Sequence, residues 1–376
     1  MAIAELALLA QEAHAGASLK PIAYGGFLLL VLAFLALDLG VFHKEAHVVS
    51  LREASMWSAI WVCCALAFGA FVYYAYNGHW LGLGLEVPVL GKAGQTETVP
   101  GIIALKQYLA GYVVEKSLSM DNVFVIAIIF AYFKVPAIYQ HRVLFWGILG
   151  ALVMRGVMIL IGAELVKRFD WILIFFGLFL VFTAIKMALV NGEVDPEANP
   201  LVRFCKRLYP VTTAYHGQKF LVVIDGVRHA TPLALALVMV EATDVVFAVD
   251  SIPAIFGLTA DPFIVFTSNI FAILGLRALY FCLAALIEKF RFLKPSLVAI
   301  LLFVGVKLLL LSSPKYLGKL MTMFGGVDPE WKGIHLSTTL TLSVVMGLLG
   351  LAIVASLIWP GSVDEKPSPD DSTPAP

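Results

Sequence analysis

Long apolar runs, broken by short polar stretches, repeat along nearly the whole chain. Each run covers about 20 residues or more, the length of helix that crosses a hydrocarbon core of about 30 Å. The runs and their polar breaks together predict nine membrane spans. They cover roughly residues 22–42, 56–76, 102–133, 142–165, 171–190, 231–258, 263–287, 296–312 and 336–359. The predicted fold class is therefore all-α, a polytopic bundle of membrane helices.

The composition supports this prediction. Hydrophobic residues make up 60% of the 376 residues and charged residues only 14%, whereas roughly a quarter of a soluble domain is charged. Mean hydropathy is +0.91. The formal net charge is zero, so nucleic acid is not an expected partner, while the lipid bilayer is. No C-x-x-C motif occurs among Cys63, Cys64, Cys205 and Cys282, which we expect to be reduced packing residues.

Lysine and arginine are distributed unequally between the two predicted sides of the membrane. If the N-terminus faces outward, the inner segments collect 13 of them and the outer segments seven. The positive-inside rule then predicts a multi-pass protein of the cell (inner) membrane with its N-terminus outside and its C-terminus in the cytoplasm. Residues 1–21 would be an extracytoplasmic segment, and the proline-rich tail 360–376 a disordered cytoplasmic one.

The longest predicted inner loop, residues 191–230, divides the chain into two membrane halves. The first half would be 22–190, with five spans, and the second 231–359, with four. Within the loop, Asp225 and Gly226 lie between two short runs of β-type residues and predict a hairpin. The loop is a candidate surface for a cytoplasmic partner.

Two of the predicted spans carry acidic residues in their middle. The third span contains Glu115, Asp121 and Asn122, and the sixth contains Glu241, Asp244 and Asp250. Both stretches repeat the pattern Asp-x-Val-Phe, from Asp121 and from Asp244. A short motif repeated in two halves is typical of transporters built from internal repeats, whose ion sites lie near the midplane of the membrane.

Helical spacing does not bring all of these acids to one face. Glu241 and Asp244 lie one turn apart, but Asp250 would point to the opposite side of a straight helix. Glu115 and Asp121 also diverge. Either both spans are discontinuous, the sixth near Pro253, or each span serves two neighbouring sites. We expect discontinuous helices as the simpler answer, because unwound turns in such helices commonly coordinate ions.

Placing these charges inside the membrane costs free energy, which protonation or pairing with a cation must offset. One charged residue at the centre of a span costs roughly 2.5–3.5 kcal/mol on insertion scales, so five unpaired carboxylates would cost about 12–17 kcal/mol. The simple alternative is salt bridging to basic residues within spans, chiefly Lys116, Arg155, Lys186 and Arg277. That alternative is weaker for the three acids of the sixth span, because no Lys or Arg lies nearer to them in sequence than Arg228 or Arg277.

The oxygen chemistry of the two spans suits a hard divalent cation. Carboxylates with Asn and Ser or Thr are ligands for Mg²⁺, Ca²⁺ or Mn²⁺, and neither span contains the His or Cys that zinc or copper would prefer. Crowded carboxylates also have raised pKa values and bind protons more readily, so protons are candidates for exchange with the metal. The predicted metal ligands are Glu115, Asp121, Asn122, Glu241, Asp244 and Asp250. No cofactor other than this cation is expected.

Several stretches resemble a known family. "ALDLGVFHK", "EKSLSMDNVFVIA", "FGLFLVFTAIKM" and the long segment from "TPLALALVMVEATDVVFAVDSIPAIFG" to "LRALYF" are similar to the TerC family of integral membrane proteins, in its Alx-like branch. The resemblance extends from about residue 22 to residue 312. It implies two acidic motifs, Glu115 with Asp121 and Asn122, and Glu241 with Asp244 and Asp250. It also implies a link to manganese export, with tellurium resistance as the older label.

Two classes of function remain open from the sequence. The first is a divalent metal transporter, with Mn²⁺ export, in exchange for protons, as the leading expectation and Ca²⁺ exchange as a variant. The second is a membrane sensor or scaffold for stress, pH or metal that binds cations without moving them. An enzyme is not expected, because no nucleophile with its base, P-loop or dinucleotide motif is found.

Overall fold

The structure, a computed structural model, describes residues 19–40, 50–92, 94–169, 171–189, 207, 210–212, 214–284, 292–323 and 336–359. The helices in this part of the chain are α2 (Lys20–Gly40), α3 (Leu51–Asn77), α4 (Gly101–Tyr132), α5 (Ala137–Arg168), α6 (Ile172–Leu189), α8 (Pro232–Phe256), α9 (Pro262–Leu274), α10 (Leu276–Ala284), α11 (Leu293–Met323) and α12 (Thr338–Ile358). The expected N-terminal segment, apart from its last residues, and the expected tail 360–376 lie outside the described residues.

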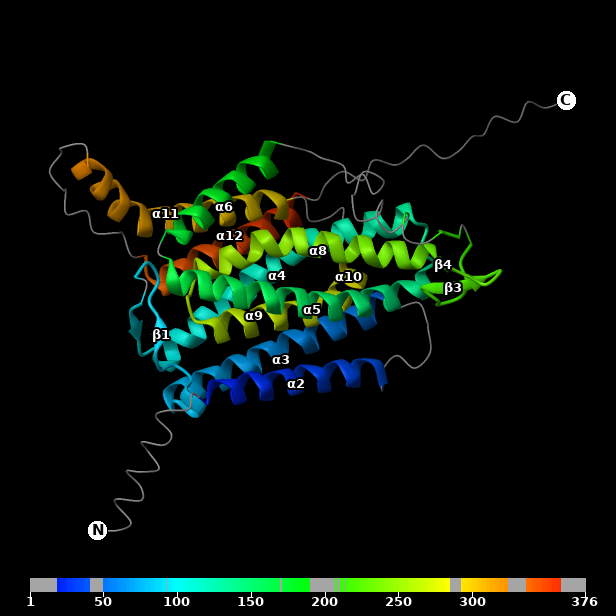
Figure 1. Ribbon diagram of the computed structural model, residues 1–376, viewed down its shortest axis with the longest axis horizontal. Coiled ribbons are helices and arrows are strands. Elements are labelled where there is room, and N and C mark those ends of the chain that lie inside the picture. The colour runs from blue at the N-terminus through cyan, green and yellow to red at the C-terminus, as the bar shows by residue number, and fades with distance from the viewer. Residues whose placement is uncertain are drawn as a thin grey trace, which may run out of the picture.

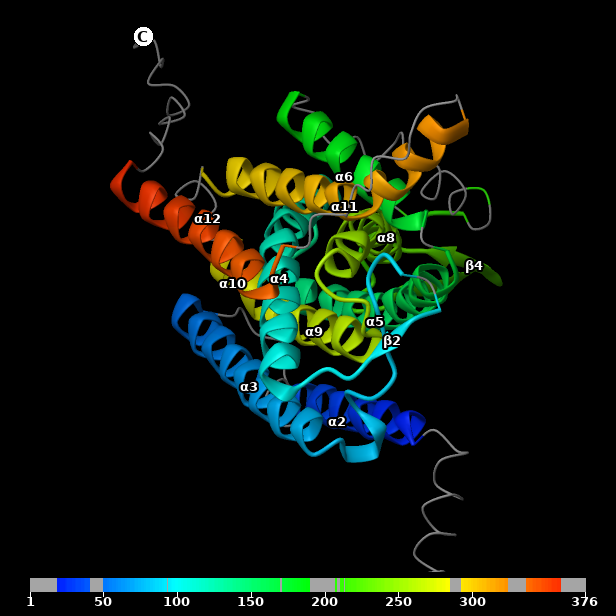
Figure 2. The same cartoon turned by 90° about the vertical axis from the view of Figure 1, so that its left-hand side faces the viewer.

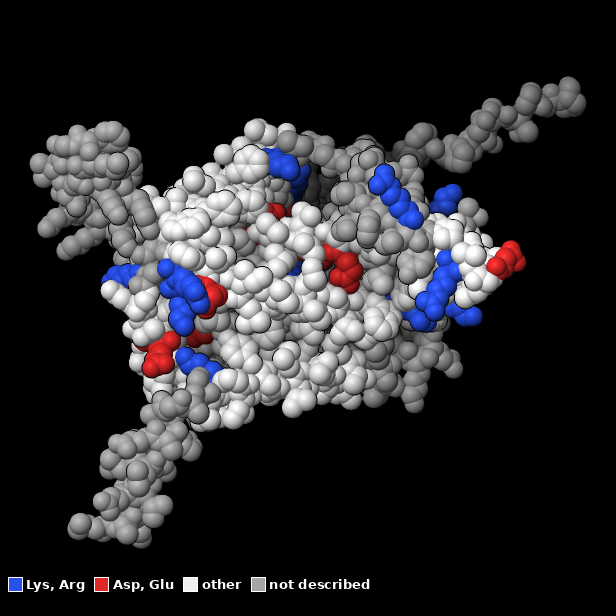
Figure 3. Space-filling view, in the orientation of Figure 1, with Lys and Arg blue, Asp and Glu red and all other residues white. Residues whose placement is uncertain are grey.

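The helices lie side by side along the long axis of the molecule (Figure 1). Short structures close the two ends: the 3-10 turn η1 (Trp80–Gly82) and the strands β1 (Val87–Pro88) and β2 (Thr96–Glu97) at one end, and β3 (Leu221–Ile224) and β4 (Val227–Ala230) at the other. The lysines and arginines visible in Figure 3 lie mainly towards these ends, and a largely uncharged band separates them. This arrangement is that of a bundle that crosses a membrane along its length.

Eight stretches of the described residues are long and apolar enough to span a membrane. They correspond to all the predicted spans except the third, which is α4. Lys106, Glu115, Lys116 and Asp121 make α4 too polar for such a test, although it has 32 residues. The prediction of an all-α polytopic membrane bundle is therefore confirmed, and the helix that departs most from an apolar composition lies in its interior (Figure 2).

Several helices begin where the sequence provides a capping side chain. The hydroxyl of Ser50 accepts from the backbone of Glu53, Thr231 caps α8, and Asp261 accepts from the first N–H groups of α9. Proline follows both Thr231 and Asp261, at a position where its missing N–H leaves no donor unpaired. These caps fix the ends of α8 and α9 and so set the heights at which their polar residues lie.

The centre of the bundle is formed by α4 and α9, which the other helices surround (Figure 2). The span that contains α9 and α10 is buried almost throughout. Helix α4 packs on α9, α5 on α8, and α6 on α11. Each helix of the group α4–α6 thus packs against a helix of the group α8–α11. Gly177 and Gly305 let α6 and α11 approach closely, because a Cβ at either position would lie 3.0 Å from the other residue's carbonyl oxygen.

The expected breaks in the third and sixth spans do not occur. Helix α4 runs unbroken through "EKSLSMDN", which contains neither Gly nor Pro, and α8 continues past Pro253 to Phe256. Pro253 lies in the last turn of α8, so the hydrogen bond that it cannot donate and the clash of its ring with the preceding turn affect only the C-terminal end of the helix. The expectation of discontinuous acidic spans was therefore wrong.

The seventh predicted span is the one that divides, between α9 and α10 at Gly275. The Lys116 ammonium on α4 donates to the carbonyl of Ala272 in the last turn of α9, at 3.3 Å. A cation at this position stabilises the unpaired carbonyls at a helix C-terminus. A side chain on Gly275 would lie 2.8 Å from the same ammonium nitrogen.

The predicted hairpin in the inner loop is confirmed. Strands β3 and β4 pair antiparallel, with Ile224 opposite Val227. The two turn residues, Asp225 and Gly226, have φ of 50° and 78°, as a tight hairpin with an Asp-Gly turn requires. The division of the chain into two halves by the loop 191–230 stays a prediction.

Candidate functional site

An arginine lies at the centre of the bundle, enclosed by oxygen atoms. Arg155 of α5 is 1% exposed. Its Nε and Nη2 donate to the two carboxylate oxygens of Asp244 on α8, at 3.1 and 2.8 Å. Its Nη1 donates to Glu115 Oε1 on α4, and also contacts Ser251 Oγ at 3.3 Å and Asn269 Oδ1 at 3.1 Å. Four helices thus contribute side chains to one buried polar centre.

Two amides complete this centre. Asn269 of α9 donates from Nδ2 to the second oxygen of Glu115, at 3.2 Å, and Asn122 of α4 donates to Asp244 Oδ1 at 3.3 Å. We call Glu115, Asn122, Arg155, Asp244, Ser251 and Asn269 the Arg155 cluster. With both acids ionised, its two carboxylates and one guanidinium carry a net charge of −1. A positive charge is therefore the ligand that the cluster favours.

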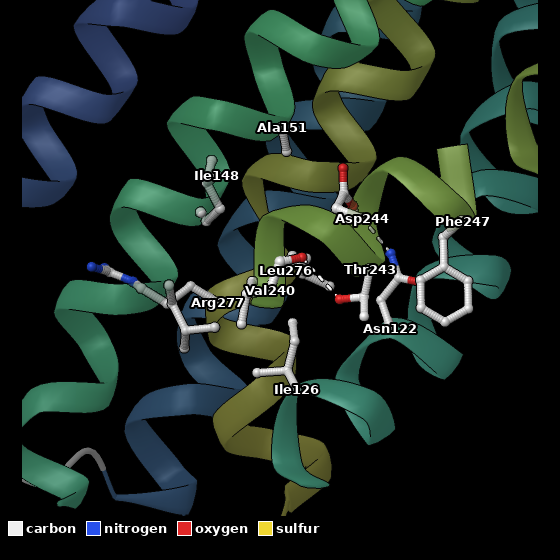
Figure 4. A pocket seen from close by; sticks show the side chains of 12 residues that line it. Asn122, Ile126, Ile148, Ala151, Val240, Thr243, Asp244, Phe247, Leu276 and Arg277 are labelled. Carbon is white, nitrogen blue, oxygen red and sulfur yellow. Dashed lines mark hydrogen bonds between the residues drawn. The ribbon is translucent and has the colours of Figure 1, made fainter. Parts of the chain in front are cut away.

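A small recess adjoins the cluster (Figure 4). The residues of α4 and α5 that line it lie in the parts of these helices nearer the β3–β4 hairpin. Asn122, Thr243 and Asp244 provide polar atoms to its lining. In Figure 4, Asn122 and Asp244 face each other, whereas the guanidinium of Arg277 is directed away from them. Asn122 Oδ1 is buried and has no hydrogen-bond partner among the described residues, so the recess offers an acceptor that a cation or water can use.

A larger cavity of about 320 Å³ lies towards the opposite end of the bundle. Gln107, Thr259 and Lys307 are among the polar residues that line it, and Thr259 donates to the side-chain oxygen of Gln107 at 3.0 Å. Lys307 of α11 is 7% exposed and has no hydrogen bond or ion pair within the described part of the chain. This cavity therefore presents a positive charge, in contrast to the cluster.

The unbroken α4 connects these three features. Gln107 precedes Glu115 by eight residues and Asn122 follows it by seven, which correspond to about 12 Å and 10 Å along a helix. The cavity, the Arg155 cluster and the recess therefore follow one another along the helix. The cluster separates two spaces that lie towards opposite ends of the bundle.

The six predicted metal ligands do not form one site in this structure. Glu115, Asn122 and Asp244 belong to the Arg155 cluster. Glu241, one turn from Asp244, is half-buried beside Gly150 of α5. Across the described residues, no three His, Cys, Asp or Glu side chains lie close enough together to hold a metal ion.

The remaining two acids have other neighbours. Asp250 accepts from the hydroxyl of Thr183 on α6 at 3.0 Å, with the charge of Lys186 nearby. Asp250 faces away from Asp244, as residues six positions apart on a straight helix do. Asp121 is half-buried on α4, where the charge of Lys294 on α11 acts on it.

One argument from the sequence was wrong about Asp244. Distance along the chain to the nearest base made salt bridging seem the weaker interpretation, yet Asp244 pairs with Arg155, 89 residues away. The packing of α5 on α8 brings the two together. Ser251 and Asn269 were not predicted as members of the site. Their only signal was polarity within apolar helices, which ordinary helix–helix hydrogen bonds also explain.

The fold and the cluster define an integral membrane protein with a buried polar centre of two acids and one arginine. The comparisons with known proteins agree with this class: residues 101–361 match the integral membrane protein TerC family, and the chain belongs to that family. No solved structure matches the chain.

Its relatives cover most of its length. An uncharacterized membrane protein, STKORF319, of Myxococcus xanthus is 47% identical over 340 residues, 90% of this chain and 93% of the relative. The putative membrane-bound redox modulator Alx of Photorhabdus laumondii is 46% identical, over 78% of this chain and 87% of the relative. The protein of that name in Escherichia coli K12 is 41% identical, over 89% of this chain and 94% of the relative. The predicted resemblance to the Alx-like branch of the TerC family is thus confirmed.

Proposed function

We propose that this protein transports a divalent metal cation across the membrane, with export of Mn²⁺ from the cytoplasm in exchange for protons as the expected reaction. The observation that carries the proposal is the Arg155 cluster, a buried set of oxygen ligands with net negative charge between two spaces that lie towards opposite ends of the bundle. A transporter needs a central site of this kind, reached from either side in turn.

The chemistry of the cluster supports a hard cation. Glu115 and Asp244 supply carboxylate oxygens, while Asn122, Ser251 and Asn269 supply neutral ones. Mg²⁺, Ca²⁺ and Mn²⁺ share this preference for oxygen. Mn²⁺ is chosen here on the TerC resemblance, and Ca²⁺ is the competitor that a test must include.

The orientation is part of the proposal. We place the β3–β4 hairpin and the recess on the cytoplasmic side of the inner membrane, and the cavity that contains Lys307 on the outer side. The excess of lysine and arginine in the predicted inner segments supports this placement. Cytoplasmic Mn²⁺ would then enter through the recess, beside Asn122 and Asp244.

A sensor that binds metal without moving it is the rival function. The sensor stays a candidate because relatives are named putative redox modulators, and a modulator need not transport anything. Catalysis is not part of either proposal. The measurement that separates the two functions is flux.

The experiment is Mn²⁺ flux in proteoliposomes with an imposed pH gradient, with Ca²⁺ as competitor. Asp244→Asn removes one charge from the cluster. Glu164→Gln is the matched control, because Glu164 is exposed and its ion pair among the described residues is with Arg168 at the end of α5. We expect flux that the gradient drives, that Asp244→Asn abolishes and that Glu164→Gln preserves. Binding of Mn²⁺ by the wild type without any flux would support the sensor instead.

A further inference from the structure

Every polar contact that Arg155 makes in the cluster is with an oxygen atom of the kind that binds a hard cation. Its three nitrogens contact both oxygens of Asp244, one of Glu115, Ser251 Oγ and Asn269 Oδ1. Carboxylate, amide and hydroxyl oxygens in such numbers are what a divalent cation uses as ligands. The guanidinium therefore lies where these oxygens would otherwise hold an ion.

We propose that Arg155 is the resident cation of the site: it neutralises the acids when no metal is bound, and a divalent cation binds by displacing it. This inference rests on the proposed function. It also explains why no cluster of acids stands ready for metal in the described residues, because the oxygens of Glu115 and Asp244 are already taken by a positive charge.

The two occupants are exclusive because both need the oxygens of Glu115 and Asp244, which Arg155 already contacts. With Arg155 in place, the cluster carries −1, and a divalent cation in its place gives zero. Both together would put a dication beside a guanidinium in a buried centre, where like charges repel strongly. Arginine keeps its proton in proteins, so it must move away from the acids when metal arrives.

The recess provides a place for the displaced side chain. Its lining includes Gly147, Ile148 and Ala151 of α5, which lie one to two turns before Arg155. Long side chains on a helix lean towards its N-terminus, over the preceding turn. The displaced Arg155 would therefore turn from the cluster over Ala151 towards the recess, and the recess, which is small, must widen to take the guanidinium. The unpaired Asn122 Oδ1 in that recess is an acceptor for it.

A resident cation of charge +1 also sets a threshold for selectivity. A monovalent ion gains nothing in charge by replacing Arg155, and it brings no fixed hydrogen bonds to match those of the guanidinium. A divalent ion brings an additional charge to two carboxylates. The site would thus reject Na⁺ and K⁺ because of Arg155 itself.

The test compares Mn²⁺ binding by wild type, Arg155→Gln and Arg155→Lys in detergent, from calorimetry and from the rise in melting temperature with added metal. We expect Arg155→Gln to bind Mn²⁺ about tenfold more tightly than wild type, to be the least stable without metal, and to gain the most from it. Arg155→Lys should be intermediate, because an ammonium lacks the forked donors of a guanidinium. High Na⁺ should weaken Mn²⁺ binding in Arg155→Gln but not in wild type.

The outcomes separate the inference from the function on which it rests. If wild type transports Mn²⁺ but folded Arg155→Gln binds it more weakly or equally, Arg155 is a structural partner and the inference is overturned. If Arg155→Gln does not fold, Arg155→Lys decides: tighter binding than wild type supports displacement, and equal or weaker binding contradicts it. If wild type neither binds nor moves Mn²⁺, the proposed function fails first.

Discussion

Gly150 of α5 lies directly against the carboxylate of Glu241 on α8, so closely that a methyl group at position 150 would overlap the acid. The absence of a side chain there lets α5 and α8 approach, and it leaves space for a charged group inside the membrane. We expect Gly150→Ala to displace Glu241 or separate the helices. The cost in the free energy of unfolding should be about 1 kcal/mol, at the low end for overpacked positions, because the atoms that the methyl group would overlap lie at the end of a flexible, half-buried side chain.

The measurement is denaturation of the purified protein in detergent, together with Mn²⁺ flux. Gly156→Ala is the control on the same helix, because its methyl group would meet Phe266 at 3.5 Å, an ordinary contact. That variant should be neutral or slightly more stable, since alanine favours helix over glycine. Equal stability of the two variants would show that Glu241 does not depend on the space at Gly150.

Two of the three acids of α8, Asp244 and Asp250, should differ in their importance for stability. Asp244 accepts two charge-assisted hydrogen bonds from Arg155, whereas Asp250 accepts one from Thr183, which an amide oxygen can also accept. We expect Asp244→Asn to lower the free energy of unfolding by about 1.5–3 kcal/mol and Asp250→Asn by about 0.5 kcal/mol. Unfolding titrations in detergent measure both, and the reverse order would argue against the cluster as the polar core.

The sequence predicted the helices well because hydropathy alone requires them. Nine spans, the hairpin at Asp225 and Gly226 and the polar character of α4 all follow from local composition. The site was only partly predictable. Glu115, Asn122 and Asp244 were named as ligands, but their common partner Arg155 belongs to another helix, and no rule of spacing connects position 155 to position 244. Such a contact depends on how α5 packs on α8.

The wrong expectation of broken helices has a related cause. It preferred convergence of the acids of one span on a single site over two neighbouring sites, and a straight helix cannot bring them together. In the structure α8 stays straight, and its acids face different neighbours: Asp244 faces Arg155, and Asp250 faces Thr183. The helix break that does occur is at Gly275, between α9 and α10, and no acidic residue near it in the sequence indicated a break there.

The buried charge of Lys307 should lower the free energy of unfolding. Its ammonium is buried at the wall of the larger cavity and has no partner among the described residues, so it loses hydration without gaining an ion pair. We expect Lys307→Met to raise the free energy of unfolding by about 1 kcal/mol. Lys106→Met, which loses an exposed hydrogen bond to Thr339, is the control and should have little effect. A loss of stability in Lys307→Met would indicate a favourable contact of the charge.

Stability should also depend on pH through Asp261, the capping residue before α9. Burial raises the pKa of its carboxyl above the ordinary 3.8, although hydrogen bonds from Tyr76 and from the backbone of Phe263 and Ile264 oppose the shift. Lys20 and Tyr24 of α2 are the other titratable groups that act on it. A raised pKa in the folded state means that protonation favours folding.

The contribution of Asp261 is therefore fully present below about pH 4 and is lost as the pH rises through the raised pKa. Melting temperatures measured from pH 3.5 upward should show this fall in wild type. Asp261→Asn keeps an oxygen to cap α9 and removes the titration, so its curve should be flatter over the same range. Identical curves for the two proteins would exclude Asp261 as the source of the pH dependence.

Gln107, Glu115 and Asn122 lie on one continuous helix, because α4 has no break between the cavity and the recess. If α4 rotates about its axis as one body, all three side chains turn through the same angle. A movement of α4 as one body would therefore change the lining of the larger cavity, the Arg155 cluster and the recess together.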